Sequence, residues 1–329
     1  LSWFDPTRGA NLFSLYDSVR HVPASLFTSE ELALLVERAA SLLRSTAAAE
    51  QLCALTALTT LSEYRAEELK APVLAAIKPM RVQPNSAASY RKARLEQMLK
   101  AEPWQPAALE SRLLSELYLM NLKSAVHWMV KLGNIDRLSE HAASCPADAF
   151  HVSTHLSNLL LVSEHLPVRE HAGRALLQLS KSLTVEQRNE IVIELCRGLE
   201  SLGQEYARYI PSCLGELCAG LPDMEQTETI DELERLVRSN NIRAACAALS
   251  ALGQCLIRAD FGQEEGDRLL AERCDRILGI LLSGLAHYDD AVHRMALSVL
   301  CRDVFAADRL SLVRRRSLFM RLCKKIYTL

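Results

Sequence analysis

The sequence predicts an all-α fold, a right-handed α-solenoid in which pairs of helices stack in series. A helix-pair pattern recurs four times in the C-terminal half, and no segment shows the alternation typical of a β-strand. The second helices of the pairs start their pattern near residues 168, 206, 241 and 292, so the steps are 38, 35 and 51 residues. A period of this size is typical of solenoids, because each pair buries its apolar face on its neighbours. The longer last step predicts an insertion in the last repeat.

Residues 1–145 are predicted to form an irregular helical region. After an aromatic lead-in, Thr28 and Glu31 have the spacing of a capping box and predict a helix start. Pro72 predicts a kink or a helix boundary, and a break between two helices is expected near Gly133 and Asn134. The helices expected in this region cover residues 29–43, 47–64, 66–78 and 86–100, followed by two more over 106–142.

Residues 146–329 are predicted to form the regular array and to end in a basic amphipathic helix. A second capping box, Thr184 to Gln187, starts one of the first helices. The first helices of the four pairs are expected over 150–165, 185–201, 226–240 and 269–284, the second helices over 167–183, 205–221, 241–257 and 291–305, and the terminal helix over about 308–327.

The second helices carry a resemblance to a known repeat. Residues Val168–Leu179 read V-R-x-x-A-x-x-A-L-x-x-L, which resembles the second helix of a HEAT repeat, and Val292–Leu300 is similar with its arginine one place later. The copies at Tyr206 and Asn241 depart from the pattern at the first position. The resemblance covers about residues 150–305 and implies HEAT-like helix pairs. It also implies a protein-binding scaffold, although some HEAT arrays are enzymes or nucleic-acid binders.

Composition narrows the class of protein. Hydrophobic residues make up 49% of the chain and charged residues 24%, enough for a packed core. A net charge of −2 makes a nucleic-acid partner unlikely. The ten cysteines form no C-x-x-C pair and favour a reducing, cytoplasmic compartment. The apolar stretch over 277–288 is too short to span a membrane, for which about 20 residues are needed. Because the chain starts at Leu1 rather than Met, we expect a fragment of a longer protein.

A metal site is a minor alternative. His151 and His155 are spaced i, i+4, so both rings can face one point in space, as two zinc ligands would. The sequence encodes no clear third ligand, and no nucleotide-binding or hydrolase motif is present. We therefore predict no metal, no other cofactor and no catalytic residue.

Arginines recur near the start of each second helix: Arg169, Arg208, Arg243 and Arg294. Stacking would bring them into a row along one side of the array. Either each arginine bonds its neighbouring repeat, or the row receives an acidic partner through bidentate contacts. The third repeat lacks an acid beside Arg243, so the row is expected to be open there.

The C-terminal segment is strongly basic. Eight basic residues lie between Arg302 and Lys325, among them Arg314, Arg315 and Arg316, against two acids. A basic amphipathic helix binds an acidic partner or a membrane surface, or it caps the array by packing. In contrast, residues 223–234 hold six acids, which we interpret as a solvated helix start.

These observations predict a non-catalytic scaffold that binds a protein partner, with an unknown oligomeric state. The rival hypothesis is an accessory helical domain of a multidomain enzyme, with a metal at the histidine cluster formed by His141, His151, His155, His165 and His171. A catalytic motif preceding Leu1 would favour the second hypothesis.

Overall fold

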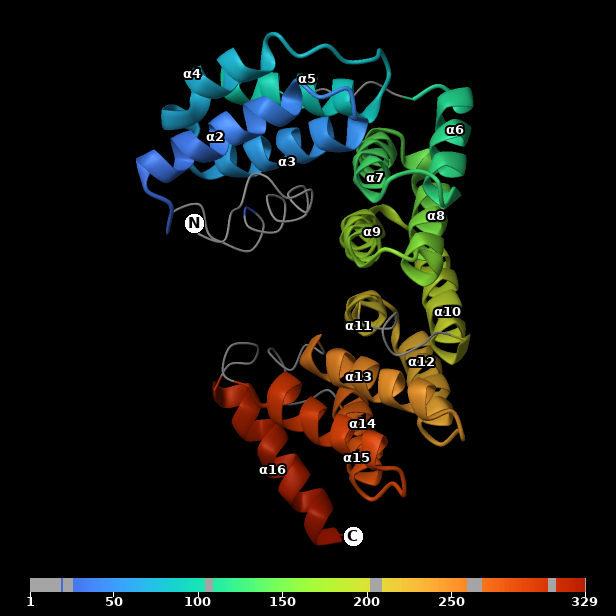
Figure 1. The fold of residues 1–329 in the computed structure, drawn as a ribbon. Coiled ribbons are helices and arrows are strands. Elements are labelled where there is room, and N and C mark those ends of the chain that lie inside the picture. The colour runs from blue at the N-terminus through green and yellow to red at the C-terminus, as the bar shows by residue number, and fades with distance from the viewer. Residues whose placement is uncertain are drawn as a thin grey trace. The chain divides into compact units, whose positions relative to one another are not determined.

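A computed structural model describes residue 19 and residues 26–103, 109–201, 209–258, 268–306 and 312–328. Every regular element in these ranges is helical, and the helices pack as sequential pairs (Figure 1), so the predicted all-α fold of HEAT-like helix pairs is confirmed. The chain divides into two compact units, Leu1–Ser144 and Cys145–Leu329. That residues 1–145 and 146–329 are separate domains stays a prediction.

The first unit begins its described helices with a confirmed capping box. The Thr28 hydroxyl accepts from the Glu31 amide at 3.2 Å, and the Glu31 carboxylate accepts from the Thr28 amide at 2.9 Å. Helix α3 packs against α2, α4, α5 and α7, so it is the centre of this unit. The helices are α2 (Ser29–Leu43), α3 (Ala48–Tyr64), α4 (Ala66–Ile77), α5 (Ala87–Lys100), α6 (Ser111–Leu122) and α7 (Trp128–Ser144).

Two expectations about helix breaks need correction. Pro72 lies inside α4, so no boundary falls there. The residue is exposed, as is Glu68 one turn earlier, so water can solvate the carbonyl that lacks its usual amide partner. Gly133 and Asn134 lie inside α7, and the break falls at residues 123–127. A Cβ on Gly133 would lie 2.8 Å from the Cβ of Ala87, so this glycine allows α5 and α7 to approach closely.

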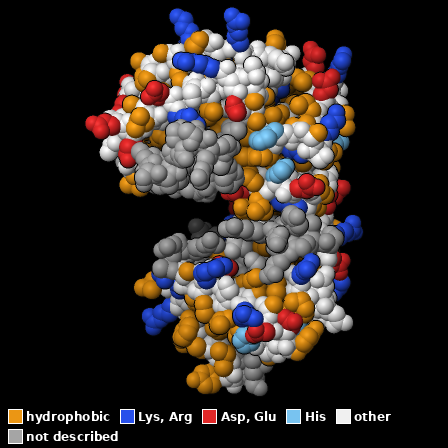
Figure 2. Space-filling model, viewed as in Figure 1, with side chains coloured by type: hydrophobic (Ala, Val, Ile, Leu, Met, Phe, Trp, Pro, Cys, Tyr) orange, Lys and Arg blue, Asp and Glu red, His pale blue; other side chains and the backbone are white. Residues whose placement is uncertain are grey.

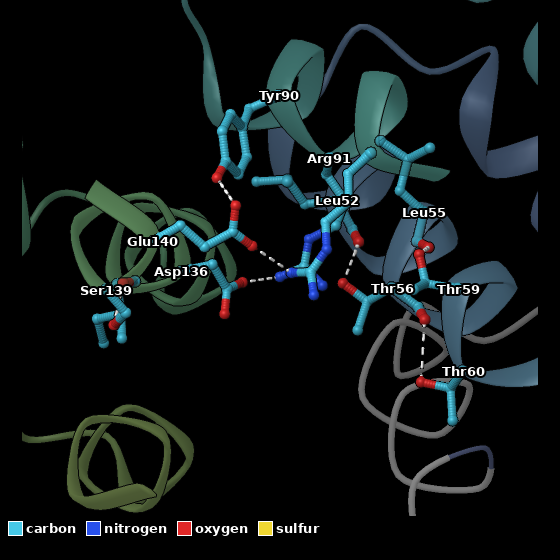
Figure 3. A network of polar contacts seen from close by, with 12 residues as sticks. Leu52, Leu55, Thr56, Thr59, Thr60, Tyr90, Arg91, Asp136, Ser139 and Glu140 are labelled. Carbon is cyan, nitrogen blue, oxygen red and sulfur yellow. Dashed lines mark hydrogen bonds and ion pairs between the residues drawn. The ribbon is translucent and has the colours of Figure 1, made fainter. Parts of the chain in front are cut away.

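Polar contacts hold α5 against α7. The buried guanidinium of Arg91 forms an ion pair with Asp136, and Tyr90 donates to the Glu140 carboxylate (Figure 3). Arg94 pairs with the same carboxylate at 2.7 Å. Because a buried charge is costly unless it is paired, these contacts fix the register of the two helices.

The second unit contains the regular array. Its pairs are α8 (Ala149–Val162) with α9 (Leu166–Leu179), α10 (Val185–Ser201) with α11 (Ile210–Ala219), α12 (Asp223–Val237) with α13 (Ile242–Arg258) and α14 (Arg268–Leu285) with α15 (Asp290–Ser298). First helices contact first helices of the next pair, and second helices contact second helices (Figure 1). A π-helical turn, Val299–Val304, follows α15, and α16 (Leu312–Thr328) packs on α14.

The apolar pattern of the second helices defines the core of this unit. Recurring pattern positions are buried in all four pairs: Ala172, Ile210, Cys246 and Ala296 at one, and Leu176, Leu214, Leu249 and Leu300 at the next. The departure of Asn241 from the repeat pattern has a local cause, whereas Tyr206 lies outside the described residues. The Asn241 side chain accepts from the Ala244 amide at 3.2 Å and caps α13, whereas Pro211 stands in the first turn of α11, where its missing amide has no partner to lose. The capping box of Thr184 and Gln187 is present in both directions, at 3.1 and 3.3 Å.

Candidate functional site

The predicted arginine row is made of dissimilar members. Arg169 is 2% exposed and its Nε donates to the Ser163 carbonyl within its own pair, so it is not presented to a partner. Arg294 is exposed and forms an ion pair with Asp290 of the same helix. Arg208 lies outside the described residues. Glu170, which follows Arg169, is instead near Arg174 and accepts from the Tyr209 hydroxyl at 3.1 Å.

Among the described arginines of the row, Arg243 is the one without a partner. Its side chain is exposed at the start of α13, and it has no hydrogen bond or ion pair with any residue that the structure describes. That the row receives an acidic partner at this arginine stays a prediction. A single exposed arginine is a weak binding site, because an exposed ion pair contributes at most about 1 kcal/mol.

Helix α16 presents a much larger surface. Leu318 is fully buried against the array, and Arg321 holds α16 to α14 through Asp275 at 3.1 Å. The packing role considered for this helix is therefore present. A second face of the helix points to solvent with six large apolar side chains, each more than half exposed: Leu312, Val313, Phe319, Met320, Ile326 and Tyr327.

These six side chains follow a repeat of seven residues. Leu312, Phe319 and Ile326 form one row at i, i+7 and i+14, and Val313, Met320 and Tyr327 form a second row beside it. We call this surface the α16 stripe. Monomeric proteins rarely expose contiguous apolar patches of this kind except at binding sites. Figure 2 shows hydrophobic and basic side chains gathered over α16.

The charged side chains of α16 itself all have one sign. Residues 312–328 contain six basic residues and no acid. Arg316 is exposed within the stripe and Arg315 is half-buried beside it, whereas Arg302, exposed in the preceding π-helical turn, is paired with Asp303 at 3.7 Å. The side chain of Arg314 is outside the described part of the structure. The sequence located this basic helix correctly, but which residues of it bind a partner stays a prediction.

A groove between α10 and α12 has no counterpart among the features predicted from the sequence. Two adjoining depressions of about 610 and 340 Å³ share Asn189, Ile193 and Arg197. Ile193 is 42% exposed within the groove. We call this surface the α10–α12 groove. The acids along it are Glu186, Glu190, Glu194, Glu225, Glu228 and Glu232.

Most of these carboxylates lack a cation. Among the described residues, Glu186, Glu190, Glu194, Glu225 and Glu228 form no ion pair within 4 Å, whereas Glu232 pairs with Arg235 at 2.7 Å. Burial raises the pKa of Glu194, and the neighbouring charge of Glu190 raises it further. The i, i+4 spacing of Glu186, Glu190 and Glu194 was the sequence signal for this acidic face.

The rings of His151 and His155 differ in their exposure to solvent. His151 is exposed, whereas His155 is 9% exposed, and burial lowers its pKa to about 4. His141 is buried and accepts from the Leu109 amide at 3.1 Å. Within the described ranges, no group of three or more histidine, cysteine or acidic side chains is placed to hold a metal ion.

Most of the cysteines are buried thiols that pack between helices. All ten are free, and seven are buried. Burial raises the pKa of Cys196 and of Cys213 to about 12, so both are protonated at neutral pH. A protonated, buried thiol is a small hydrophobic group rather than a nucleophile.

Among the described helices, none is both long and apolar enough to cross a membrane.

No protein-family model and no curated protein matches the chain. Some solved structures are similar to the chain. One of them is described as the structural basis of tubulin recruitment and assembly by microtubule polymerases with tumor overexpressed gene (TOG) domain arrays. Its TM-score is 0.43 at 10% identity, and the match covers 98% of this chain and 73% of the other.

Two further structures are similar in the same way. An engineered protein has a TM-score of 0.36 at 18% identity over 92% of this chain and 76% of its own length. A homology model of the full-length AP-3 complex in an intermediate open conformation has a TM-score of 0.37 at 15% identity, over 82% and 51% of the two chains. These likenesses concern the fold alone. The serial pairing of α8 to α15 by itself makes the second unit an array of helical repeats.

Proposed function

We propose that this chain is a non-catalytic scaffold that binds an acidic protein segment through the α16 stripe. The observation that carries the proposal is the exposure of six large apolar side chains in two rows on one basic helix. Rows at i, i+7 and i+14 suit a partner helix, which buries such rows against its own apolar face.

The charge of α16 defines the chemistry of the partner. Residues 312–328 carry basic groups and no acid, so an acidic segment is attracted and a basic one repelled. The exposed Arg316 offers a planar fork to a carboxylate. The apolar area favours a protein partner over a nucleic acid, whose backbone requires charge rather than hydrophobic contact. The free thiols support a cytoplasmic location, which is part of this proposal.

The test uses a fluorescent synthetic peptide that forms an acidic amphipathic helix of leucine and glutamate. Fluorescence anisotropy should show binding to the wild-type chain that weakens as salt increases. The double variant Val313→Glu/Met320→Glu should bind at least tenfold more weakly, because it removes two apolar contacts and reverses the local charge. The matched control Val162→Glu changes another exposed valine, 60% accessible at the end of α8, and should bind as the wild type does.

Two results would contradict the proposal. Equal loss of binding in Val162→Glu would show a non-specific charge effect. Absence of peptide binding, with tight binding of an anionic phosphatidylserine vesicle or of duplex DNA instead, would make α16 a membrane or nucleic-acid element.

A further inference from the structure

Two surfaces of the second unit are complementary to each other. The α16 stripe is apolar and basic, whereas the α10–α12 groove has Ile193 and one cation, Arg197, at its centre and six acids along it. Each surface alone would need an external partner. The predominance of acids in a groove between two helices, and of bases on an apolar helix, makes each a fitting partner for the other.

The two surfaces cannot meet within one chain as the second unit is built. Helix α16 is fixed to α14 by the buried Leu318 and by the ion pair of Arg321 with Asp275. The groove lies between α10 and α12, with Thr154 of α8 also in its lining. Because α12 and α14 are successive first helices, α16 is attached one repeat further along the array. The groove is therefore reached by the α16 of another molecule.

We propose that a second copy of this chain is the partner, and that its α16 stripe docks into the α10–α12 groove. The inference rests on the proposed function of α16 and names its partner. In the docked pair, Leu312, Phe319 and Ile326 lie along the groove over Ile193. Arg316 and its basic neighbours face Glu190, Glu194 and Glu228, which have no cation of their own among the described residues.

The resulting contact is head-to-tail. The stripe and the groove are different surfaces, so a pair of molecules keeps one unused groove on one molecule and one unused stripe on the other. Such heterologous contacts continue into open chains or close into rings. The exposed acids of the groove then repel one another less, because each gains a basic neighbour, and the association weakens with salt.

A mixing experiment tests this geometry. The groove variant Glu190→Arg/Glu228→Arg retains an intact stripe, and the helix variant Arg316→Ser/Met320→Ser, which introduces no acid, retains an intact groove. Sedimentation velocity over a range of concentrations should show association of the wild type and at least tenfold weaker association of each variant alone. A 1:1 mixture of the two variants should form a dimer and stop there, because only one compatible contact is left.

The controls separate this inference from the proposed function. Circular dichroism verifies that each variant is folded, and Glu37→Arg/Glu67→Arg, which reverses two exposed glutamates of the first unit, should associate as the wild type does. A monomeric mixture, or a wild type that stays monomeric at all concentrations, would overturn the head-to-tail pairing. Peptide binding by the groove variant would then still support the function of α16. Loss of association in the helix variant but not in the groove variant would indicate a symmetric α16–α16 contact and would also overturn the pairing.

Discussion

At the scale of single residues, similar sequence positions have different environments. Arg169 and Arg243 both stand near the start of a second helix, yet the first is buried and the second is exposed. A buried guanidinium bonded to a carbonyl contributes to stability, because its loss leaves an unsatisfied acceptor and a void. An exposed guanidinium contributes little.

We therefore expect Arg169→Ala to lower the free energy of unfolding by about 2 kcal/mol or more, since the Ser163 carbonyl loses its charged donor. Arg243→Ala should cost less than about 1 kcal/mol. Urea unfolding followed by circular dichroism measures both values. If Arg243→Ala were the more damaging variant, the exposed arginine would have a structural partner, and the identification of the open repeat would be wrong.

His155 makes stability depend on pH. Its folded pKa of about 4 is depressed by burial, whereas an unfolded histidine titrates near about 6.5. The unfolded state thus binds a proton first, so stability is fully present above about pH 6.5 and falls as the pH is lowered toward 4. Between pH 7.5 and 4.5, the wild type should lose about 2 kcal/mol more than His155→Gln does. A ring that titrates near 6.5 by NMR in the folded protein would exclude this effect.

At the scale of the helices, close packing decides which glycines are replaceable. A Cβ on Gly215 of α11 would lie 2.6 Å from the Cβ and 2.7 Å from the carbonyl carbon of Gln254 on α13. The backbone of a neighbouring helix cannot move without disturbing its other contacts. A Cβ on Gly173 of α9 would meet the Cys213 thiol at 3.0 Å, and a side chain yields more easily.

Gly215→Ala should therefore destabilise the protein by about 2 kcal/mol, through overpacking of α11 on α13. Gly173→Ala is the matched control. There, the gain of about 1 kcal/mol in helix propensity offsets the smaller steric cost, so the change should be near zero. Thermal unfolding of the two variants gives the comparison, and equal destabilisation would show that the α9–α11 contact is as tight as the α11–α13 contact.

At the scale of the whole molecule, the second unit consists of neighbours packed on neighbours. Each first helix contacts the adjacent first helices, and each second helix contacts the adjacent second helices. Stability in such an array is approximately a sum of local terms, so the loss of one end removes only the terms at that end.

Deletion of residues 286–329 removes α15 and α16 and exposes the faces of α13 and α14 that they cover. The buried Leu249 and Leu281 lie on these helices, so we expect a lower melting temperature and aggregation on heating. The remaining helices should persist. Far-ultraviolet circular dichroism per residue is the measurement, and complete loss of helical signal would show that the unit is one cooperative globular domain instead of an array.

The candidate surfaces were only partly accessible to sequence reasoning. The basic, amphipathic nature of α16 is encoded locally, by residue type and helical spacing. Whether its apolar residues face the array or the solvent depends on which face α14 covers: Leu318 is buried and Met320 is exposed, although both are large apolar residues. The α10–α12 groove joins acids that are about 40 residues apart, such as Glu190 and Glu228. Only the stacking of two first helices brings them to one surface.

The all-α class, the order of the helix pairs and both capping boxes could be predicted from the sequence, because these features depend on short-range spacing and local hydrogen bonds. The apolar positions Ala172, Ile210, Cys246 and Ala296 were also readable from it. Three features became apparent only from the packing of the helices. Gly133 lies where two helices cross and is not a helix break, Arg169 is buried, and one apolar face of α16 is exposed to solvent. The physical reason is the same in each case. Burial and close approach depend on residues from other helices, and no local pattern specifies which helix will cover a given face.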